Sequence, residues 1–206
     1  WNQQQQEIRA HYLAVGRELV RPTSSQRDRE LGFDRELWQA LGSSGLFGIH
    51  MPKQYGGQGL GIREFSAALE GFSEGCHDMG VLVSFVAQVA LVQAALISYG
   101  SEEQLQRWLP PLISGEKIGC FAITEQGCGS DVRSLKLAAR RDGDGYRLNG
   151  MKWNITNAPV ADICMTFARL EEGGANAISC FITDTAKPGL TQSTPFELMG
   201  NRGTPI

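Results

Sequence analysis

Apolar residues repeat at helical spacing through the first half of the chain. One such face recurs every three or four residues, at Ile62, Phe65, Leu69 and Phe72. This spacing predicts an amphipathic helix with one side turned inward. A second helix is expected after Asp34, a good N-cap residue, with Leu37 and Leu41 facing the core. Gly42 and Gly45 are the signals that would end it.

The span 79–99 is apolar almost all round. Its length would let it cross a membrane. However, Gln88 and Gln93 lie inside it, and its neighbours have the pattern of amphipathic helices, so a helix buried in a bundle fits better. Ser101 and Gln104 then form a capping box for another helix. We therefore expect no membrane span.

The period changes to two after about residue 116, beyond the paired prolines Pro110 and Pro111. The alternation at 135–139, the turn residues 142–145, and the apolar runs near 163–167 and 178–182 predict strands. Asn149-Gly150 is the strongest short hairpin signal. The pattern predicts an α+β protein: an N-terminal α-helical bundle, residues 1–116, followed by an antiparallel β-barrel-like domain, residues 117–206.

Composition narrows the class of protein. The chain is 42% hydrophobic and 20% charged with a net charge of −3, and it has no basic run longer than Arg140-Arg141, which argues against nucleic-acid binding. The five cysteines form no C-x-x-C pair, and the three histidines lack metal-ligand spacing. Without a recognisable signal peptide, reduced thiols favour a cytoplasmic protein.

The segment 121–131 carries the candidate chemistry. A strand expected to end at Thr124 runs into a loop with Gly127 and Gly129, whose backbone N–H groups could approach an anion closely. Ser130 adds a hydroxyl donor, and the Thr124 hydroxyl could reach the edge of a ring. The loop suits a phosphate joined to a planar heteroaromatic group, although an ordinary hairpin turn explains the same spacing. Neither a dinucleotide-binding G-x-G-x-x-G nor a P-loop is present.

Five ordered segments resemble the acyl-CoA dehydrogenase family. They are Pro52-x-x-Tyr55-Gly56-Gly57-x-Gly59, Gly100-x-Glu102-Glu103-Gln104 before Trp108-Leu109-Pro110, Thr124-Glu125-x-x-x-Gly129-Ser130-Asp131, Asn149-Gly150-x-Lys152-x-x-Ile155-Thr156-Asn157, and Met199-Gly200-x-Arg202-Gly203. Together they span about 150 residues and are specific in combination.

The resemblance implies FAD as cofactor and assigns residues to it. The backbone of Phe121, Ile123 and Thr124, with the Thr124 hydroxyl, would contact the flavin ring. Gly129 and Ser130 would hold the pyrophosphate, and Ser130 would also touch a thioester substrate. Thr156 would hydrogen-bond near flavin N5 and so tune the cofactor.

One position departs from the family pattern. The residue before Ile155-Thr156 is usually an aromatic that packs on the flavin, but here it is Asn154, with Trp153 one place earlier. In a strand, one residue of shift turns a side chain to the opposite face. Either Asn154 contacts the flavin or a local bulge brings Trp153 to it. On the apolar helix, Ser84 is a candidate for the substrate pocket, whereas Phe85 fits core packing better.

The family reaction is the α,β-dehydrogenation of an acyl thioester, carried by coenzyme A or an acyl carrier protein. Its base is a carboxylate, which the resemblance places in a C-terminal helical domain outside these residues. Electron-transfer flavoprotein or another acceptor and a homo-oligomer, dimer or tetramer, are implied as partners. Two alternatives stay open: an oxygen-using flavoenzyme of the same fold, such as an acyl-CoA oxidase or flavin monooxygenase, and a degenerate non-catalytic module.

Overall fold

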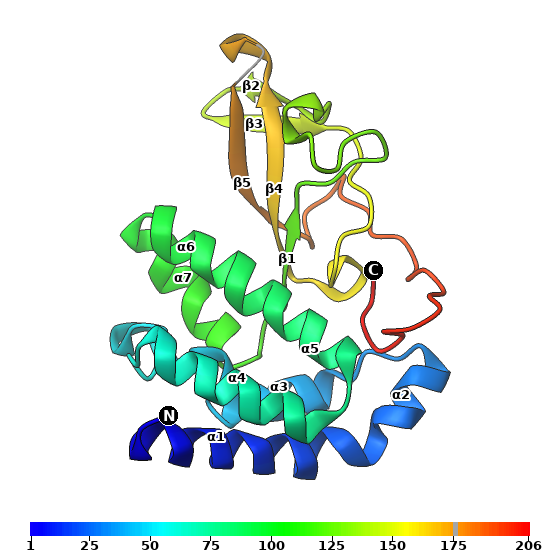
Figure 1. Ribbon diagram of the computed structural model, residues 1–206. Helices are drawn as coiled ribbons and strands as arrows, with labels where there is room; N and C mark the ends of the chain where they lie inside the picture. Colours follow the sequence, from blue (N-terminus) through cyan, green and yellow to red (C-terminus); the bar gives the residue numbers. More distant parts are fainter. Residues whose placement is uncertain (175–176) are drawn as a thin grey trace.

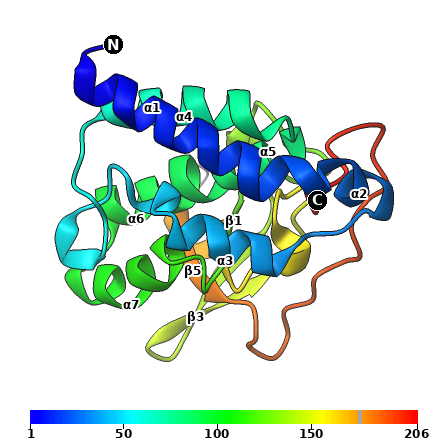
Figure 2. The same ribbon diagram turned by 90° about the horizontal axis from the view of Figure 1, so that it is seen from below.

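The computed structural model describes residues 1–174 and 177–206, in which helices form one end of the molecule and strands rise from them (Figure 1). The helices are α1 (Gln3–Val15), α2 (Ser24–Glu30), α3 (Arg35–Ser43), α4 (Ile62–Cys76), α5 (Met79–Val86), α6 (Ala94–Tyr99) and α7 (Glu102–Ile113). The view from below shows α1 lying along α4 (Figure 2). Arg9 on α1 joins this pair of helices by binding Glu70, at 2.6 Å, and Glu74.

The helix start signals read from the sequence are confirmed. Asp34 caps α3 by accepting a hydrogen bond from the backbone N–H of Leu37 at 2.9 Å. Ser101 and Gln104 cap α7 reciprocally, because each side chain accepts from the other's backbone N–H, at 3.3 and 2.9 Å. These bonds satisfy donors that a helix N-terminus otherwise leaves unpaired.

The predicted stop signals are only partly right. Gly45 follows the end of α3 in a left-handed conformation, φ +82°, as a stop requires. Gly42 instead lies inside α3, where a Cβ would collide with the carbonyl oxygen of Ser114, so its role is close packing against the end of α7. Pro110 and Pro111 lie near the end of α7, the last helix before the sheet.

One long apolar helix forms the centre of the helical part. A π-helical segment, Ala87–Gln93, joins α5 to α6 without a break. Among the described residues, this helix is long and apolar enough to cross a membrane, but 56% of its most apolar stretch is buried inside the protein. Phe85 is fully buried in an aromatic cluster with Phe47 and Phe72, as expected of a core residue, while Val86 is exposed.

The β-part is an open mixed sheet, so the expected antiparallel barrel is wrong. Its strands are β1 (Gly119–Ala122), β2 (Ala138–Asp142), β3 (Gly145–Asn149), β4 (Ile163–Leu170) and β5 (Ile178–Asp184). The long β4 pairs parallel with β1 and β2 and antiparallel with β5. A period of two identifies strands and their faces but carries no information on the direction of a partner. The long return from β1 to β4 makes the parallel pairing possible.

Of the two turns predicted from the sequence, one forms a hairpin and the other does not. β2 and β3 form the predicted hairpin, closed by the pair Asp142 and Gly145. Asn149-Gly150 is not a hairpin turn, because β3 ends there and the chain leaves the sheet. Gly150 has φ +145°, and a Cβ on it would lie 2.8 Å from the Cα of Leu137. Glycine is needed here for a close backbone crossing.

The helices and the sheet share one hydrophobic core. Ile163 and Met165 of β4 belong to the same buried cluster as Phe85 and Leu112. The opposite face of the sheet forms a smaller cluster that includes Cys120 and Ile155. The loop after β1 is therefore attached to a strand that packs against the helices, whereas β3 pairs with β2 at the far end of the sheet.

Candidate functional site

The loop after β1 is built around a tight turn. The strand ends at Ala122, two residues before the expected end at Thr124. Glu125 and Cys128 then exchange both backbone hydrogen bonds, each at 3.0 Å. This closes the turn and directs the following residues, Gly129 and Ser130, into an exposed bend.

Unpaired donors follow one another in that bend. The backbone N–H groups of Gly129, Ser130 and Asp131, and the Ser130 hydroxyl, have no hydrogen-bond partner within residues 1–174 and 177–206. A Cβ built on Gly129 would meet no atom within 4 Å, so there is open space beside these donors. Successive free N–H groups next to open space are the features of a backbone anion site. The residues present thus fit a pyrophosphate.

The segment after β3 runs beside this loop. The backbone N–H of Trp153 donates to the carbonyl oxygen of Thr124 at 2.9 Å. Three residues farther on, Thr156 is half-buried, as is Thr124. Neither threonine hydroxyl has a hydrogen-bond partner in the described part of the chain. Two free hydroxyls on adjoining segments fit the edge of a polar ring system.

Residues 155 and 156 do not lie in a strand, contrary to the premise of the sequence argument. Asn154 and Asn157 have φ angles of +52° and +68°. The backbone N–H of Ala158 donates to the carbonyl oxygen of Ile155, which closes a tight turn. Asparagine tolerates this left-handed conformation better than most residues. The alternation of faces that a strand would impose on Trp153 and Asn154 therefore does not apply.

The ring of Trp153 packs against the ring of Phe196. The two ring centroids lie 5.3 Å apart, at a tilt of 50°. Trp153 is half-buried by this contact, whereas Asn154 is exposed. Of the two candidates, Asn154 keeps the freer side chain, and its contact with flavin stays a prediction.

Ser84 lies deep in the structure on α5. It is fully buried, and its hydroxyl has no hydrogen-bond partner among the described residues. Its carbonyl oxygen accepts a hydrogen bond from the Asn157 side chain at 3.0 Å, so α5 lies directly behind the segment that carries Thr156. The proposed role of Ser84 in a substrate pocket stays a prediction.

An ion pair not assigned any role from the sequence lies between the two loops. Lys152 Nζ is 2.9 Å from Glu125 Oε1, and both side chains are only 9% exposed. Glu125 also accepts from the backbone N–H groups of Lys136, at 2.7 Å, and Leu137, at 2.9 Å. Burial acts to raise the pKa of Glu125, but these hydrogen bonds and Lys152 outweigh it and hold the pKa below its usual range. The carboxylate is therefore ionised and fully engaged, which does not suit a base.

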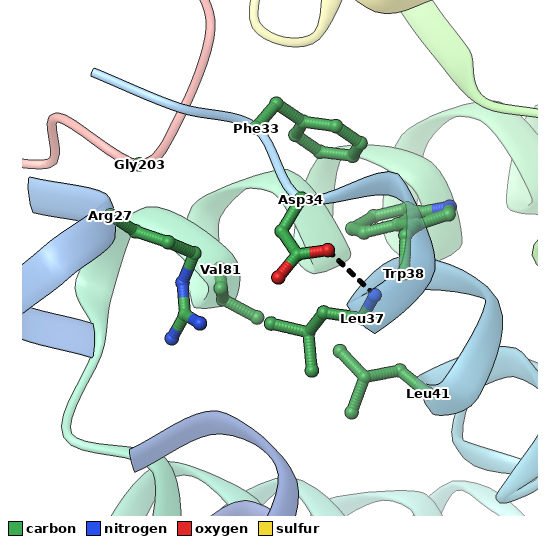
Figure 3. A pocket seen from close by; sticks show the side chains of 8 residues that line it. All are labelled: Arg27, Phe33, Asp34, Leu37, Trp38, Leu41, Val81 and Gly203. Atoms are coloured by element: carbon green, nitrogen blue, oxygen red, sulfur yellow. Dashed lines mark hydrogen bonds between the residues drawn. The ribbon is translucent and has the colours of Figure 1, made fainter. Parts of the chain in front are cut away.

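The fifth sequence segment packs against the helices, where the backbone N–H of Arg202 donates to Asp28 at 3.4 Å. Gly203 lines a small cavity with Arg27, Asp34 and Val81, and Figure 3 shows Gly203 beside Arg27 at its edge. The volume is about 10 Å³, room for roughly one water. Arg27 binds Asp78 at 2.7 Å beside it. Gly203 thus packs where α2, α3 and α5 meet.

Comparison with known proteins identifies the family. The models for the N-terminal and middle domains of acyl-CoA dehydrogenase match residues 2–116 and 120–206. The chain belongs to the acyl-CoA dehydrogenase family. Members of this family are flavin oxidoreductases.

Particular relatives cover the whole described fold. Mitochondrial isovaleryl-CoA dehydrogenase of Pongo abelii is 36% identical over 98% of this chain and 49% of its own length. The prolyl acyl carrier protein oxidase AnaB is 35% identical with a TM-score of 0.94, covering 100% of this chain and 55% of that protein. A glutaryl-CoA dehydrogenase from Mycobacterium smegmatis in complex with FADH2 is 29% identical with a TM-score of 0.91, covering 99% and 51%. The chain thus spans about half the length of the relatives it matches.

Proposed function

We propose that this chain binds FAD through the loops after β1 and β3, and that the full-length protein uses it to introduce an α,β double bond into an acyl thioester. The observation that carries the proposal is the run of unpaired N–H donors at 129–131 beside open space. The free hydroxyls of Thr124 and Thr156 on the adjoining segments support it. Family membership supplies the cofactor class.

Each residue has a distinct part in holding the cofactor. Gly129 and Ser130 bind the pyrophosphate, because free backbone N–H groups attract anionic oxygens. The backbone of Phe121 to Thr124 borders the flavin ring, and the Thr156 hydroxyl donates to it near N5. When bound, FAD supplies the acceptor for the hydride that leaves the β-carbon.

The base that takes the α-proton is assigned to none of these residues. Glu125 is a carboxylate in the right loop, but its oxygens are engaged by two backbone N–H groups and Lys152. A base needs a free lone pair directed at the substrate proton. We infer that a carboxylate outside the present 206 residues supplies it.

Two candidate functions differ in the group that carries the acyl thioester and in the electron acceptor. Similarity to an acyl carrier protein oxidase favours a thioester on a carrier protein with oxygen as acceptor. The first candidate is a coenzyme A thioester with electron-transfer flavoprotein as acceptor, in a homo-oligomer. Ser130 and Ser84 are the proposed substrate contacts in both cases.

The test is an anaerobic titration of the purified full-length protein, followed by visible absorption. We expect an oxidised flavin spectrum that one class of acyl thioester bleaches in a 1:1 ratio. Rapid return of the spectrum on admitting air would favour the oxidase, and slow return would favour the dehydrogenase. Absence of flavin even after adding FAD would refute the proposed function.

A further inference from the structure

Lys152 joins the loop after β3 to the loop after β1, where it binds the two residues that flank Thr124. Its ammonium group donates to the carbonyl oxygen of Ile123 at 3.0 Å and to Glu125 Oε1 at 2.9 Å. The next residue, Trp153, donates its backbone N–H to the Thr124 carbonyl oxygen at 2.9 Å. Two consecutive residues after β3 therefore hold three consecutive residues after β1.

Glu125 fixes the other end of the same loop. Its two carboxylate oxygens accept the backbone N–H groups of Lys136 and Leu137, just before β2 begins. The carboxylate thus closes the loop that contains the unpaired donors at 129–131. Besides the turn at Glu125 and Cys128 and local contacts within 128–135, Arg169 of β4 donates to the carbonyl oxygens of Leu135, at 3.2 Å, and Arg133. Arg169 thus fastens the loop to β4, whereas Glu125 ties the end of the loop to its start, next to Thr124.

Burial makes this ion pair different from those on the surface. Each side chain is 9% exposed, so each charge has lost most of its hydration and needs the other. The pair Arg147–Asp142 in the β2–β3 hairpin has a similar distance, 2.8 Å, but its side chains are 77% and 57% exposed. Solvent supports those two charges separately. The buried pair is thus a geometric constraint, and the exposed pair is a matched control for it.

We propose that Glu125 and Lys152 are positioning residues that set the loop of Thr124 and the 129–131 donors in the geometry that binds FAD. The inference rests on the proposed function, because it assigns to the pair the placement of the groups that hold the cofactor. Neither residue is catalytic in this assignment. Their effect reaches the cofactor through the backbone of Ile123, Thr124 and Leu137.

The test measures FAD affinity on the full-length apoprotein, by quenching of flavin fluorescence, for Lys152→Met and for the control Arg147→Met. The expected result is a Kd for FAD at least about tenfold higher in Lys152→Met, because small displacements of positioned groups have large effects on a site. The visible band of the bound flavin is expected to change shape as well. Arg147→Met should stay within about twofold of the wild type.

Two further variants separate positioning from folding. Lys152→Arg keeps the charge and should recover part of the affinity. Glu125→Gln/Lys152→Met removes the unpaired buried charge, so it should be folded even where the single variant is not, and it should still bind FAD weakly. Wild-type affinity in folded Lys152→Met and in the double variant would overturn the inference while leaving the proposed function intact. A wild-type protein that binds no FAD would overturn both.

Discussion

The side-chain amide of Asn157 donates to the carbonyl oxygen of Ser84 at 3.0 Å, which joins the segment carrying Thr156 to α5. The same Nδ2 lies 3.3 Å from the carbonyl oxygen of Gly119 at the start of β1. The backbone N–H of Asn157 donates to the carbonyl oxygen of Pro205 at 2.8 Å. One fully buried residue thus links the helical part, the sheet and the last residues of the chain.

Substitution of Asn157 should separate its hydrogen bonds from its backbone conformation. Asn157→Gly keeps the φ of +68° available but loses the amide, and should lower the free energy of unfolding by about 1–3 kcal/mol. Asn157→Ala also forces a Cβ into the left-handed region and should lose about 1 kcal/mol more. Urea denaturation of the two variants measures the difference. Equal losses would show that the conformation carries no strain.

The pH dependence of unfolding should report Glu125. Its pKa in the folded protein is below the usual value of 4.5, so ionised Glu125 stabilises the fold above about pH 4.5. That contribution is lost as the pH falls from there through the lowered pKa, because in this range the unfolded state binds a proton at Glu125 that the folded state does not. Glu125→Gln should lack this component, so wild type and variant should converge in unfolding free energy under acid conditions. A gap that stays constant with pH would contradict the assignment.

Local signals predicted much of the helical part, since a cap or an apolar stripe involves neighbours in sequence. The Asp34 cap and the Ser101–Gln104 box are examples. Most of the α4 stripe also turned inward, with Phe72 fully buried, although Ile62 at its start is 69% exposed. The loop residues of the family signature came from the resemblance instead, and their roles stay predictions.

Contacts between distant segments could not be predicted from the same signals. The parallel pairing of β1 with β4 joins residues about 44 positions apart, and alternation is identical for either direction. The Glu125–Lys152 pair depends on where two loops meet, across 27 residues. A glutamate between an apolar strand and a glycine turn was a usable hint, because buried carboxylates need partners.

Asn154 gives a direct test of the departure from the family pattern. Its φ of +52° suits asparagine or glycine, so Asn154→Gly should change the free energy of unfolding by less than about 0.5 kcal/mol. Asn154→Trp, which places an aromatic directly before Ile155-Thr156, should lose about 1–2 kcal/mol because a bulky residue is strained there. Thermal unfolding of the apoprotein measures both. A Trp variant as stable as wild type would show that the segment rearranges easily, and its FAD affinity would then decide whether the aromatic contact can be restored.

Gln88 connects the apolar helix to the start of the sheet, although the sequence alone suggested only that it interrupts an apolar span. Its Nε2 donates to the carbonyl oxygen of Leu112 at 2.9 Å, and its Oε1 accepts from Gly119 N–H at 2.8 Å. Gln88→Leu preserves the approximate volume but leaves the buried N–H of Gly119 without its partner, while the Leu112 carbonyl oxygen keeps the hydrogen bond from Gly115 N–H at 3.3 Å. The free energy of unfolding should fall by about 1–3 kcal/mol, the cost of one buried polar group without a partner.

The matched control for Gln88 is Gln106→Leu on α7. Gln106 donates to Glu102 at 2.9 Å, but both side chains are exposed, so water replaces the lost bond and the change should stay within about 0.5 kcal/mol. Urea denaturation at neutral pH compares the two variants on the same protein. A small loss in Gln88→Leu would mean that Leu112 and Gly119 find water or each other, and that the apolar helix and the sheet are joined by packing alone. A large loss confined to Gln88→Leu would establish the amide as the bond that aligns β1, and therefore the loop of Thr124, with the helix behind it.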